Sequence, residues 1–245
     1  MRFGVTNLGE RAVPAADGYP VDPGPESAWI LSRLHDISSR VDALLDEYRF
    51  SEAYSVLYSF AWSEAFDWYL ELSKSSLKQG SEEAKATLGV VLRDLLKLFH
   101  PVIPYVTEEL WSHLVGDGFL AAASWPTPPA YDEPEHFETF RDLVVGFRRF
   151  RAEHGLSPRA PLQVTLVDPD GRASDWWFPQ FEALARVSPQ VGEAPEGEVF
   201  SRVVAGTAQA FISLEGLVDV DAERARLDKE IADIAAVLER SRSKL

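Results

Sequence analysis

Hydrophobic side chains recur at helical spacing through the first half of this 245-residue chain. From Glu26 they follow one another at intervals of three and four positions, at Ile30, Leu34, Ile37, Val41, Leu44 and Tyr48. This spacing predicts one long amphipathic helix. A second helix is predicted from about Ser51 to Ser75, with aromatic residues on nearly every side, as is typical of a helix surrounded by others.

A third helix is predicted to begin after Ser81, a suitable N-cap, and to end near His100. Its end lies in the segment "LLKLFHPVIPYVTEELWSHL" (residues 95–114), where Pro101 lacks the amide hydrogen that a helix interior requires. Pro104 suits the first turn of a fourth helix. The inward side of this fourth helix is predicted to consist of Val106, Leu110, Trp111 and Leu114. Four helices with short connections indicate an antiparallel bundle.

The second half of the chain has a different pattern. The Pro-rich residues 116–134 indicate the end of the bundle, and a fifth helix is predicted at about 135–154. "LQVTLVD" (162–168) favours a strand, "DWWFPQFEALARVS" a short helix and "VFSRVVAGTAQAFISL" one or two strands. From Val220 onward, apolar residues at heptad spacing predict a coiled-coil helix, whose partner we expect beyond Leu245.

The expected fold class is therefore mainly α: an antiparallel α-helical bundle, then a small α+β unit and a truncated coiled-coil helix. We assign residues 1–25 to an irregular lead-in and residues 26–130 to the bundle. Residues 131–219 form the small α+β domain, and residues 220–245 the start of the coiled coil.

The composition excludes several kinds of site. Without cysteine, the chain has no disulfide, no thiolate ligand for zinc and no cysteine nucleophile. No apolar run is long enough to span a membrane and no signal-peptide core is present, so we expect a soluble, cytoplasmic protein without membrane contact. The net charge of 24 − 39 = −15 opposes general binding of nucleic acid.

Histidine and carboxylate residues provide two candidates for chemistry. His100, Glu109 and His113 are close in sequence, but a zinc site of the H-E-x-x-H kind needs both histidines on one helix, so we expect a helix–helix corner and no metal. The residues Glu64, Asp67 and Glu71 share one helix face, where they act either as general acid and base or as ion-pair partners of nearby cations. Nucleotide-binding glycine motifs are absent. We therefore expect no catalytic residue and no cofactor site in this chain.

Residues 141–159 hold five arginines against two acidic residues. Within the helix predicted there, arginines alternate with apolar residues, so one face packs and the other is cationic. Such a face either pairs with local acids or contacts RNA phosphates. The candidates for phosphate contacts are Arg141, Arg148, Arg149 and Arg151.

Two further segments suit the recognition of unpaired bases. "RFGVTNL" combines Arg2 and Phe3 with an amide side chain, and Trp29 and Arg33 lie one turn apart near the start of the first long helix. Proteins hold single-stranded bases by aromatic stacking, guanidinium planes and amide hydrogen bonds. For Trp29, simple packing in the bundle is the alternative.

Several segments resemble, in the same order, the carboxy-terminal part of valyl-tRNA synthetases. They are "RFGVTNLG", "AWILSRL", "YRFSEAYSVLYSFAWSEAFDWYLELSK", "LLKLFHPVIPYVTEELW", "SWP", "FRRFRAEHGLSP" and "LEGLVDVDAERARLDKEI". The resemblance covers nearly the whole chain. It implies an anticodon-binding bundle of the class I synthetase type, with Arg2 hydrogen-bonding to a base, Trp29 stacking, and Phe3 and Arg33 beside the anticodon pocket.

The catalytic H-I-G-H and K-M-S-K-S motifs of that family do not occur in this sequence. The resemblance therefore implies a non-catalytic portion or a short homologue, with ATP and valine binding to a catalytic core outside it. The implied partners are tRNA(Val), bound weakly in isolation, and the catalytic and editing domains. The alternative function is a protein–protein interaction module that self-associates through residues 220–245.

Overall fold

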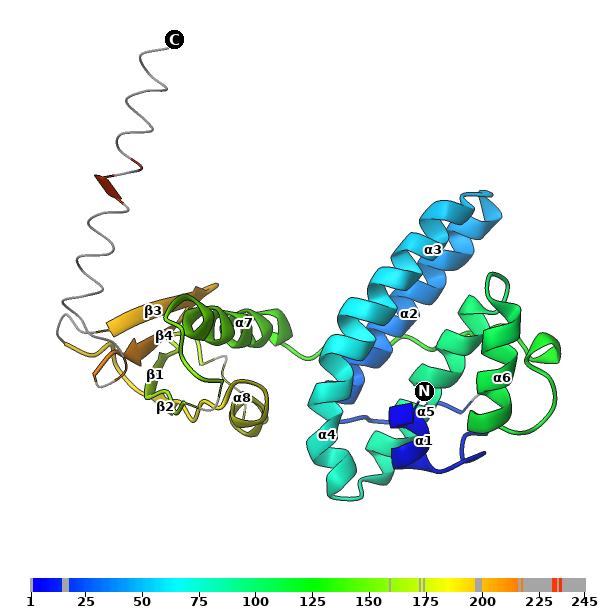
Figure 1. Cartoon of the computed structure of the whole chain (residues 1–245), viewed down its shortest axis with the longest axis horizontal. Helices are drawn as coiled ribbons and strands as arrows, with labels where there is room; N and C mark the ends of the chain where they lie inside the picture. The colour runs from blue at the N-terminus through cyan, green and yellow to red at the C-terminus, as the bar shows by residue number, and fades with distance from the viewer. Residues whose placement is uncertain are drawn as a thin grey trace, which may run out of the picture. The chain divides into compact units, whose positions relative to one another are not determined.

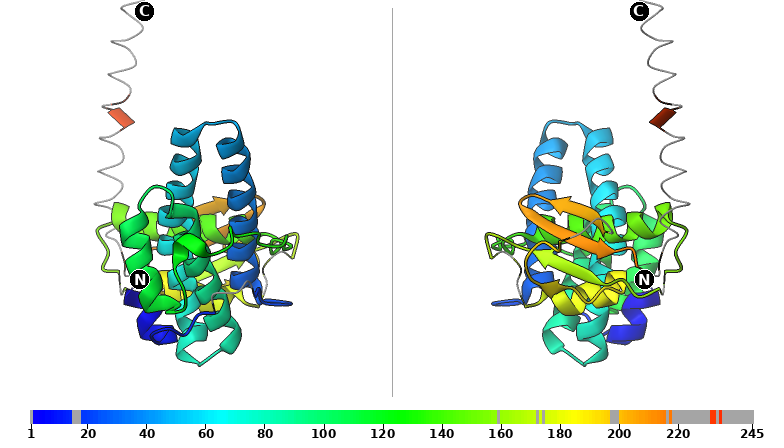
Figure 2. Two further views of the ribbon diagram at one scale, coloured as in Figure 1. Left: turned by 90° about the vertical axis from the view of Figure 1, so that its right-hand side faces the viewer. Right: turned by 90° about the vertical axis from the view of Figure 1, so that its left-hand side faces the viewer.

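Two long helical segments form an antiparallel hairpin at the start of the bundle in the computed structural model (Figure 1). Helix α2 (Pro25–Asp46) buries the predicted apolar stripe from Ile30 to Leu44, but Tyr48 lies beyond the end of the helix and is 80% exposed. Helix α3 (Phe50–Ser59) continues without a break into the π-helix η1 (Phe60–Tyr69) and helix α4 (Leu70–Lys78). The second predicted helix is thus confirmed, but the sequence did not indicate its π-helical middle. Figure 2 shows the two segments side by side.

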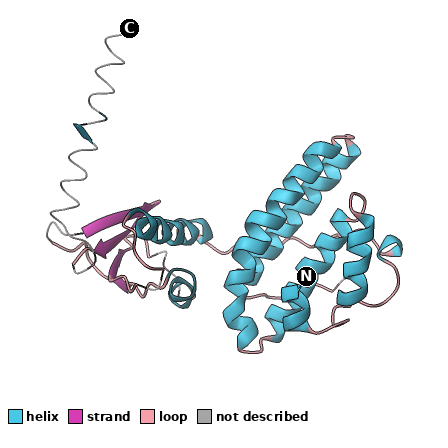
Figure 3. Cartoon of the chain, viewed as in Figure 1, coloured by secondary structure: helices cyan, strands magenta, loops and turns pink. Residues whose placement is uncertain are grey.

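The structure describes residues 2–14, 18–158, 160–171, 173, 175–196, 200–215, 217, 231, 232 and 234. The predicted coiled coil at 220–245 lies outside the described residues except for three positions, so it stays a prediction. The chain divides into two units, one up to Phe137 and one from Glu138. Figure 3 shows that the described strands all belong to the second unit. None of the helices in the described part is long and apolar enough to cross a membrane.

Helices α5 (Glu82–Phe99) and α6 (Pro104–Leu114) form the predicted corner. The Ser81 side chain accepts a hydrogen bond from the amide of Ala84 at 3.2 Å, as expected of an N-cap. Pro104 occupies the first turn of α6, and Trp111 and Leu114 are buried. One predicted position is wrong: Val106 is not on the inward face but 56% exposed.

The sequence indicated an irregular amino-terminal segment. Within this segment, however, Arg2–Leu8 form helix α1. This short helix packs against α5 and α6. Gly4 is the point of closest approach, since a Cβ atom there would lie 2.4 Å from Leu92. A helix of this length is marginal in water, so its packing on the bundle explains why it forms.

The Pro-rich segment after α6, which includes the short 3₁₀ helix η2 (Leu120–Ala122), packs onto the bundle. Trp125 Nε1 donates to Asp42 Oδ1 at 2.6 Å, and Tyr131 Oη donates to the Pro20 carbonyl at 2.8 Å. These hydrogen bonds link the segment to α2 and to the chain that precedes it. The first unit accordingly extends to Phe137.

Up to Ser213, the described residues of the second unit form a four-stranded sheet and two helices. Helix α7 (Phe137–Glu153) leads to β1 (Val164–Val167), followed by α8 (Trp177–Ala185), β2 (Gln190–Val191), β3 (Phe200–Ala205) and β4 (Ala208–Ser213). The strand order is β2-β1-β4-β3, with β1 and β2 parallel and the other pairs antiparallel. Alternate residues of β1, β3 and β4 are buried. The predicted mainly α fold with a small mixed unit is confirmed, although the sequence missed β2.

Candidate nucleic-acid interface

Of the two amino-terminal candidates, Arg2 and Phe3, only Arg2 is exposed. It lies on α1, where Phe3 is half-buried and Gly4 is fully buried against α5. Among the residues that the structure describes, no acidic side chain forms an ion pair with Arg2. Its guanidinium group is therefore free to donate hydrogen bonds to a base or a phosphate.

Trp29 does not have the role expected from the sequence. Its exposed fraction is 0%, and its ring stacks on Phe137 with centroids 4.3 Å apart and planes inclined by 14°. Both faces of a base-stacking residue cannot be enclosed by protein. Trp29 is therefore a core residue that packs Phe137, the first residue of α7, against α2, which was the alternative for this position.

Arg33 is occupied by carboxylates. Its Nε and Nη2 atoms donate to the two oxygens of Glu64 at 2.6 and 3.1 Å, and Nη1 lies 3.3 Å from Asp36 Oδ2. The hydrogen-bonded Glu64 carboxylate raises the pKa of Arg33 above its ordinary value. A bidentate pair of this kind uses most of the guanidinium fork, so Arg33 positions α2 against the π-helix and is a poor candidate for direct base contact.

The same ion pair explains the carboxylate face of the second helical segment. Glu64 is bound by Arg33, and Glu71 is bound by Lys74 at 2.5 Å. These contacts match the ion-pair interpretation of the face and not the acid–base interpretation. At the corner, His100 Nδ1 lies 2.8 Å from Thr107 Oγ1, whereas His113 contacts Glu109 at 3.3 Å on the other helix. In the described part of the chain no three potential ligands gather around a metal position.

The arginines of α7 divide into two pairs. Arg151 is buried, and its Nη2 atom donates to the carbonyls of Ala160 and Arg186 at 2.7 and 3.1 Å. Burial lowers the pKa of Arg151 below its ordinary value. Arg148 donates through two nitrogens to the Leu184 carbonyl at 3.2 and 3.0 Å. Arg151 thus binds carbonyls of the loop before β1 and of the residue after α8, and Arg148 binds the last turn of α8, so both are poorer candidates for phosphate contacts.

The other two arginines of α7 face solvent. The Arg149 side chain is 71% exposed, with Glu153 at 3.7 Å. Arg141 pairs with Glu138 at 2.6 Å on the surface. Exposed pairs of this kind contribute little free energy, so a phosphate can replace the carboxylate. Arg141 and Arg149 therefore remain candidates for phosphate contacts.

The polar end of α4 is a further candidate that was not predicted from the sequence; it consists of Lys74, Ser75, Lys78 and the C-cap residue Gln79. Lys78 and Gln79 are exposed, and Gln79 Nε2 donates to Ser75 Oγ at 3.3 Å. Ser76 Oγ donates to Glu26 Oε1 at 2.9 Å, so this end lies beside the start of α2. Amide, hydroxyl and ammonium groups are the groups that contact RNA. The signal in the sequence was the run "KSSLKQG" before the turn at Gly80.

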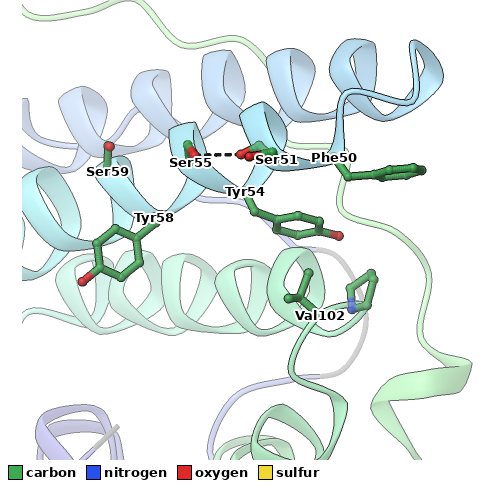
Figure 4. A pocket seen from close by; sticks show the side chains of 8 residues that line it. Phe50, Ser51, Tyr54, Ser55, Tyr58, Ser59 and Val102 are labelled. Carbon is green, nitrogen blue, oxygen red and sulfur yellow. Dashed lines mark hydrogen bonds between the residues drawn. The ribbon is translucent and has the colours of Figure 1, made fainter.

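A second exposed surface lies along α3. Phe50, Tyr54 and Tyr58 project from one side of the helix, with Ser51, Ser55 and Ser59 beside them and Val102 of the α5–α6 corner opposite (Figure 4). None of the residues lining this shallow trough is charged. It therefore lacks the cations that contact with an RNA backbone requires.

Comparison with known proteins places the helical unit among tRNA ligases. The sequence model of the family described as "Anticodon-binding domain of tRNA ligase" matches residues 27–166, from α2 into β1. The chain is 39% identical over 216 residues to the valine–tRNA ligase of Streptomyces coelicolor, covering 83% of this chain and 24% of that protein.

Other relatives give the same result. The valine–tRNA ligase of Nocardia farcinica is 37% identical over 225 residues, covering 89% of this chain and 25% of that protein. The valine–tRNA ligase of Mycobacterium tuberculosis strain H37Rv is 36% identical over 251 residues, covering 96% of this chain and 27% of that protein. The chain thus spans about a quarter of the length of these relatives.

Proposed function

Because this chain belongs to the family of anticodon-binding domains of tRNA ligases, we propose that it binds the anticodon loop of tRNA(Val) as the non-catalytic part of a valine–tRNA ligase. The observation that carries the proposal is the family match over residues 27–166, which includes helices α2 to α7. The choice of valine rests on the relatives, which are named valine–tRNA ligases.

The exposed polar groups of the first unit suit this role. Arg2 offers five N–H donors without an ion-pair partner in the described residues, and the end of α4 offers Lys78 and Gln79. On the second unit, Arg141 and Arg149 offer charge for phosphates. Since acidic side chains pair with Arg33 and Arg141 in the part of the chain that the structure describes, the isolated chain is expected to bind weakly, with the anticodon contacts deciding its specificity.

The chemistry belongs to the rest of the ligase in this proposal. ATP and valine bind to the part of a ligase that lies outside the quarter matched by this chain, and the tRNA is aminoacylated there. The contribution of this chain is to hold the tRNA so that its acceptor end reaches that site. Translation then implies a cytoplasmic location.

A binding titration tests the proposal. Fluorescence anisotropy is measured with tRNA(Val) transcript and with a transcript that differs only in the anticodon. We expect tighter binding of the unaltered transcript. Arg2→Ala is expected to weaken it by about 1–2 kcal/mol, because one charged hydrogen-bond donor is removed, and to reduce the preference for the valine anticodon.

Arg49→Ala is the matched control. Arg49 is also exposed and lies between α2 and α3, where it pairs with Glu47 and Glu52, so its removal is expected to leave the anticodon preference unchanged. Equal affinity for both transcripts would contradict anticodon recognition and leave only phosphate attraction.

A further inference from the structure

An exposed apolar surface joins the second helical segment to the α5–α6 corner. We name it the apolar corner: Tyr58, Trp62, Phe66 and Ile103 line one pocket, Val102 lines the adjoining trough with Tyr58, and Val106 lies one turn after Ile103 on α6. Tyr58 and Trp62 have stacked rings with centroids 6.2 Å apart. Trp62 is 57% exposed and Val102 is 51% exposed. Tyr105, next to Val106, is also largely exposed. Exposed apolar side chains grouped in this way mark an interaction site.

The apolar corner contains a pocket that suits a protein side chain. Tyr58, Trp62 and Phe66 lie on one wall, and the opposite wall comes from α5 and α6, with Phe99, Ile103 and Leu110. The pocket has a volume of about 300 Å³ and no charged residue lines it. Two lining residues, Tyr58 and Thr107, carry a hydroxyl group, and that of Thr107 already donates to the Ile103 carbonyl at 3.0 Å. An apolar side chain therefore fits this pocket better than a polar ligand.

The adjacent trough of Figure 4 extends this surface along α3 and shares Tyr58 with the pocket. Neither the trough nor the pocket includes a lysine or an arginine among its lining residues. An RNA backbone needs cations at its contacts, so the apolar corner suits a protein partner. Exposed aromatic residues around a pocket are typical of the centre of a protein–protein interface.

The partner follows from the length of the relatives. The chain matches about a quarter of each valine–tRNA ligase, at 24% to 27% of their length, so in such an enzyme the bundle is joined to three further quarters of protein. We propose that the apolar corner packs against an apolar surface of that remaining part of the ligase. The inference rests on the proposed function, because it requires that this chain works as part of such an enzyme. Docking there would fix the bundle, and the tRNA that it holds, relative to the rest of the ligase.

Cysteine labelling tests the inference, because the chain itself has no cysteine. Val106→Cys places a thiol in the apolar corner, and Val21→Cys places one at an exposed apolar position outside it. Maleimide labelling of each site is followed by mass spectrometry in the isolated chain and in a chimera. In the chimera this chain replaces the matching quarter of the Streptomyces coelicolor ligase.

In the chimera we expect labelling at position 106 to be at least about tenfold slower than in the isolated chain, since burial at an interface blocks access to the thiol. Labelling at position 21 is expected to change by less than about twofold. Equal labelling of position 106 in both proteins would overturn the inference. Protection of position 106 by tRNA in the isolated chain would instead indicate an RNA contact. Protection that rises with the concentration of the isolated chain would indicate a second copy.

A binding measurement gives an answer that does not depend on the chimera. The intact 245-residue chain is immobilised and exposed to the Streptomyces coelicolor ligase shortened by its matching quarter. We expect binding that the double variant Val102→Asp, Val106→Asp abolishes and Val21→Asp retains. Binding that is absent, or unchanged by the double variant, would contradict the inference. Neither result depends on tRNA, so a failure here is distinct from a failure of anticodon binding.

Discussion

At the residue scale, the neighbours of a side chain decided its role more than its chemical type did. Trp29 and Trp62 are both tryptophans on bundle helices, yet Trp29 is enclosed beside Phe137 and Trp62 is exposed at the apolar corner. Arg149 and Arg151 are two positions apart on α7, but only Arg149 faces solvent. From residue type alone, the two tryptophans would have been given the same role, and so would the two arginines.

Replacement of Trp29 by alanine tests its role as a core residue. We expect Trp29→Ala to lower the free energy of unfolding by about 3–5 kcal/mol, because it leaves a cavity beside Phe137. Chemical denaturation measures this change. The folded fraction is expected to keep the same preference for the valine anticodon as the unaltered chain. A variant of undiminished stability that had lost this preference would show that Trp29 stacks on a base after all.

At the element scale, close approaches fix how helices and strands pack. Gly146 on α7 is buried, and a Cβ atom there would lie 2.2 Å from a methyl carbon of Val203 on β3. The helix therefore approaches the sheet more closely than any residue with a side chain would allow. In the first unit, the ends of α5 and α6 follow from local signals, namely the Ser81 cap and the prolines of the corner.

Substitution at this contact tests the packing of α7 on β3. Gly146→Ala is expected to destabilise the protein by about 1–3 kcal/mol through steric overlap, although alanine favours a helix more than glycine does. Adding Val203→Ala removes the obstructing methyl groups. The double variant should therefore lose less stability than the two single changes added together, as a double-mutant cycle of urea midpoints would show. Strict additivity would mean that the two residues do not press on each other.

At the scale of the whole molecule, the net charge of −15 limits the affinity for tRNA. Acidic side chains also occupy several of the exposed cations, as Glu64 does with Arg33 and Glu138 with Arg141. Among the residues that the structure describes, these pairs leave fewer arginines and lysines to neutralise phosphates. Under the proposed function, we therefore expect firm binding of tRNA to require the rest of a ligase or low ionic strength.

The salt dependence of tRNA binding measures how many phosphates the chain neutralises. With about three contacts to a single-stranded loop, affinity is expected to fall roughly twentyfold between about 50 and 200 mM salt. Arg149→Ala should reduce this dependence and lower the affinity for both transcripts alike. A much steeper dependence would show that the chain contacts many more phosphates than its exposed arginines and lysines suggest.

The sequence by itself determined the helical bundle, the corner at Pro101 and Pro104, and most strands of the second unit. These features depend on the spacing of apolar residues, on caps and on prolines, which act within a few residues of the chain. The segments that resemble valyl-tRNA synthetases also identified the family, and the family model and the relatives confirm this.

Only the tertiary structure decided which candidate side chains are available to a ligand. Trp29 packs on Phe137, and Arg33 pairs with Glu64. Arg151 donates to the carbonyls of Ala160 and Arg186. Most of these partners lie far along the chain or on another element. Periodicity places a residue on one face of a helix, but it does not show whether another segment covers that face. For the same reason Val106 was expected inside and lies outside: the fold turned that face of α6 toward solvent.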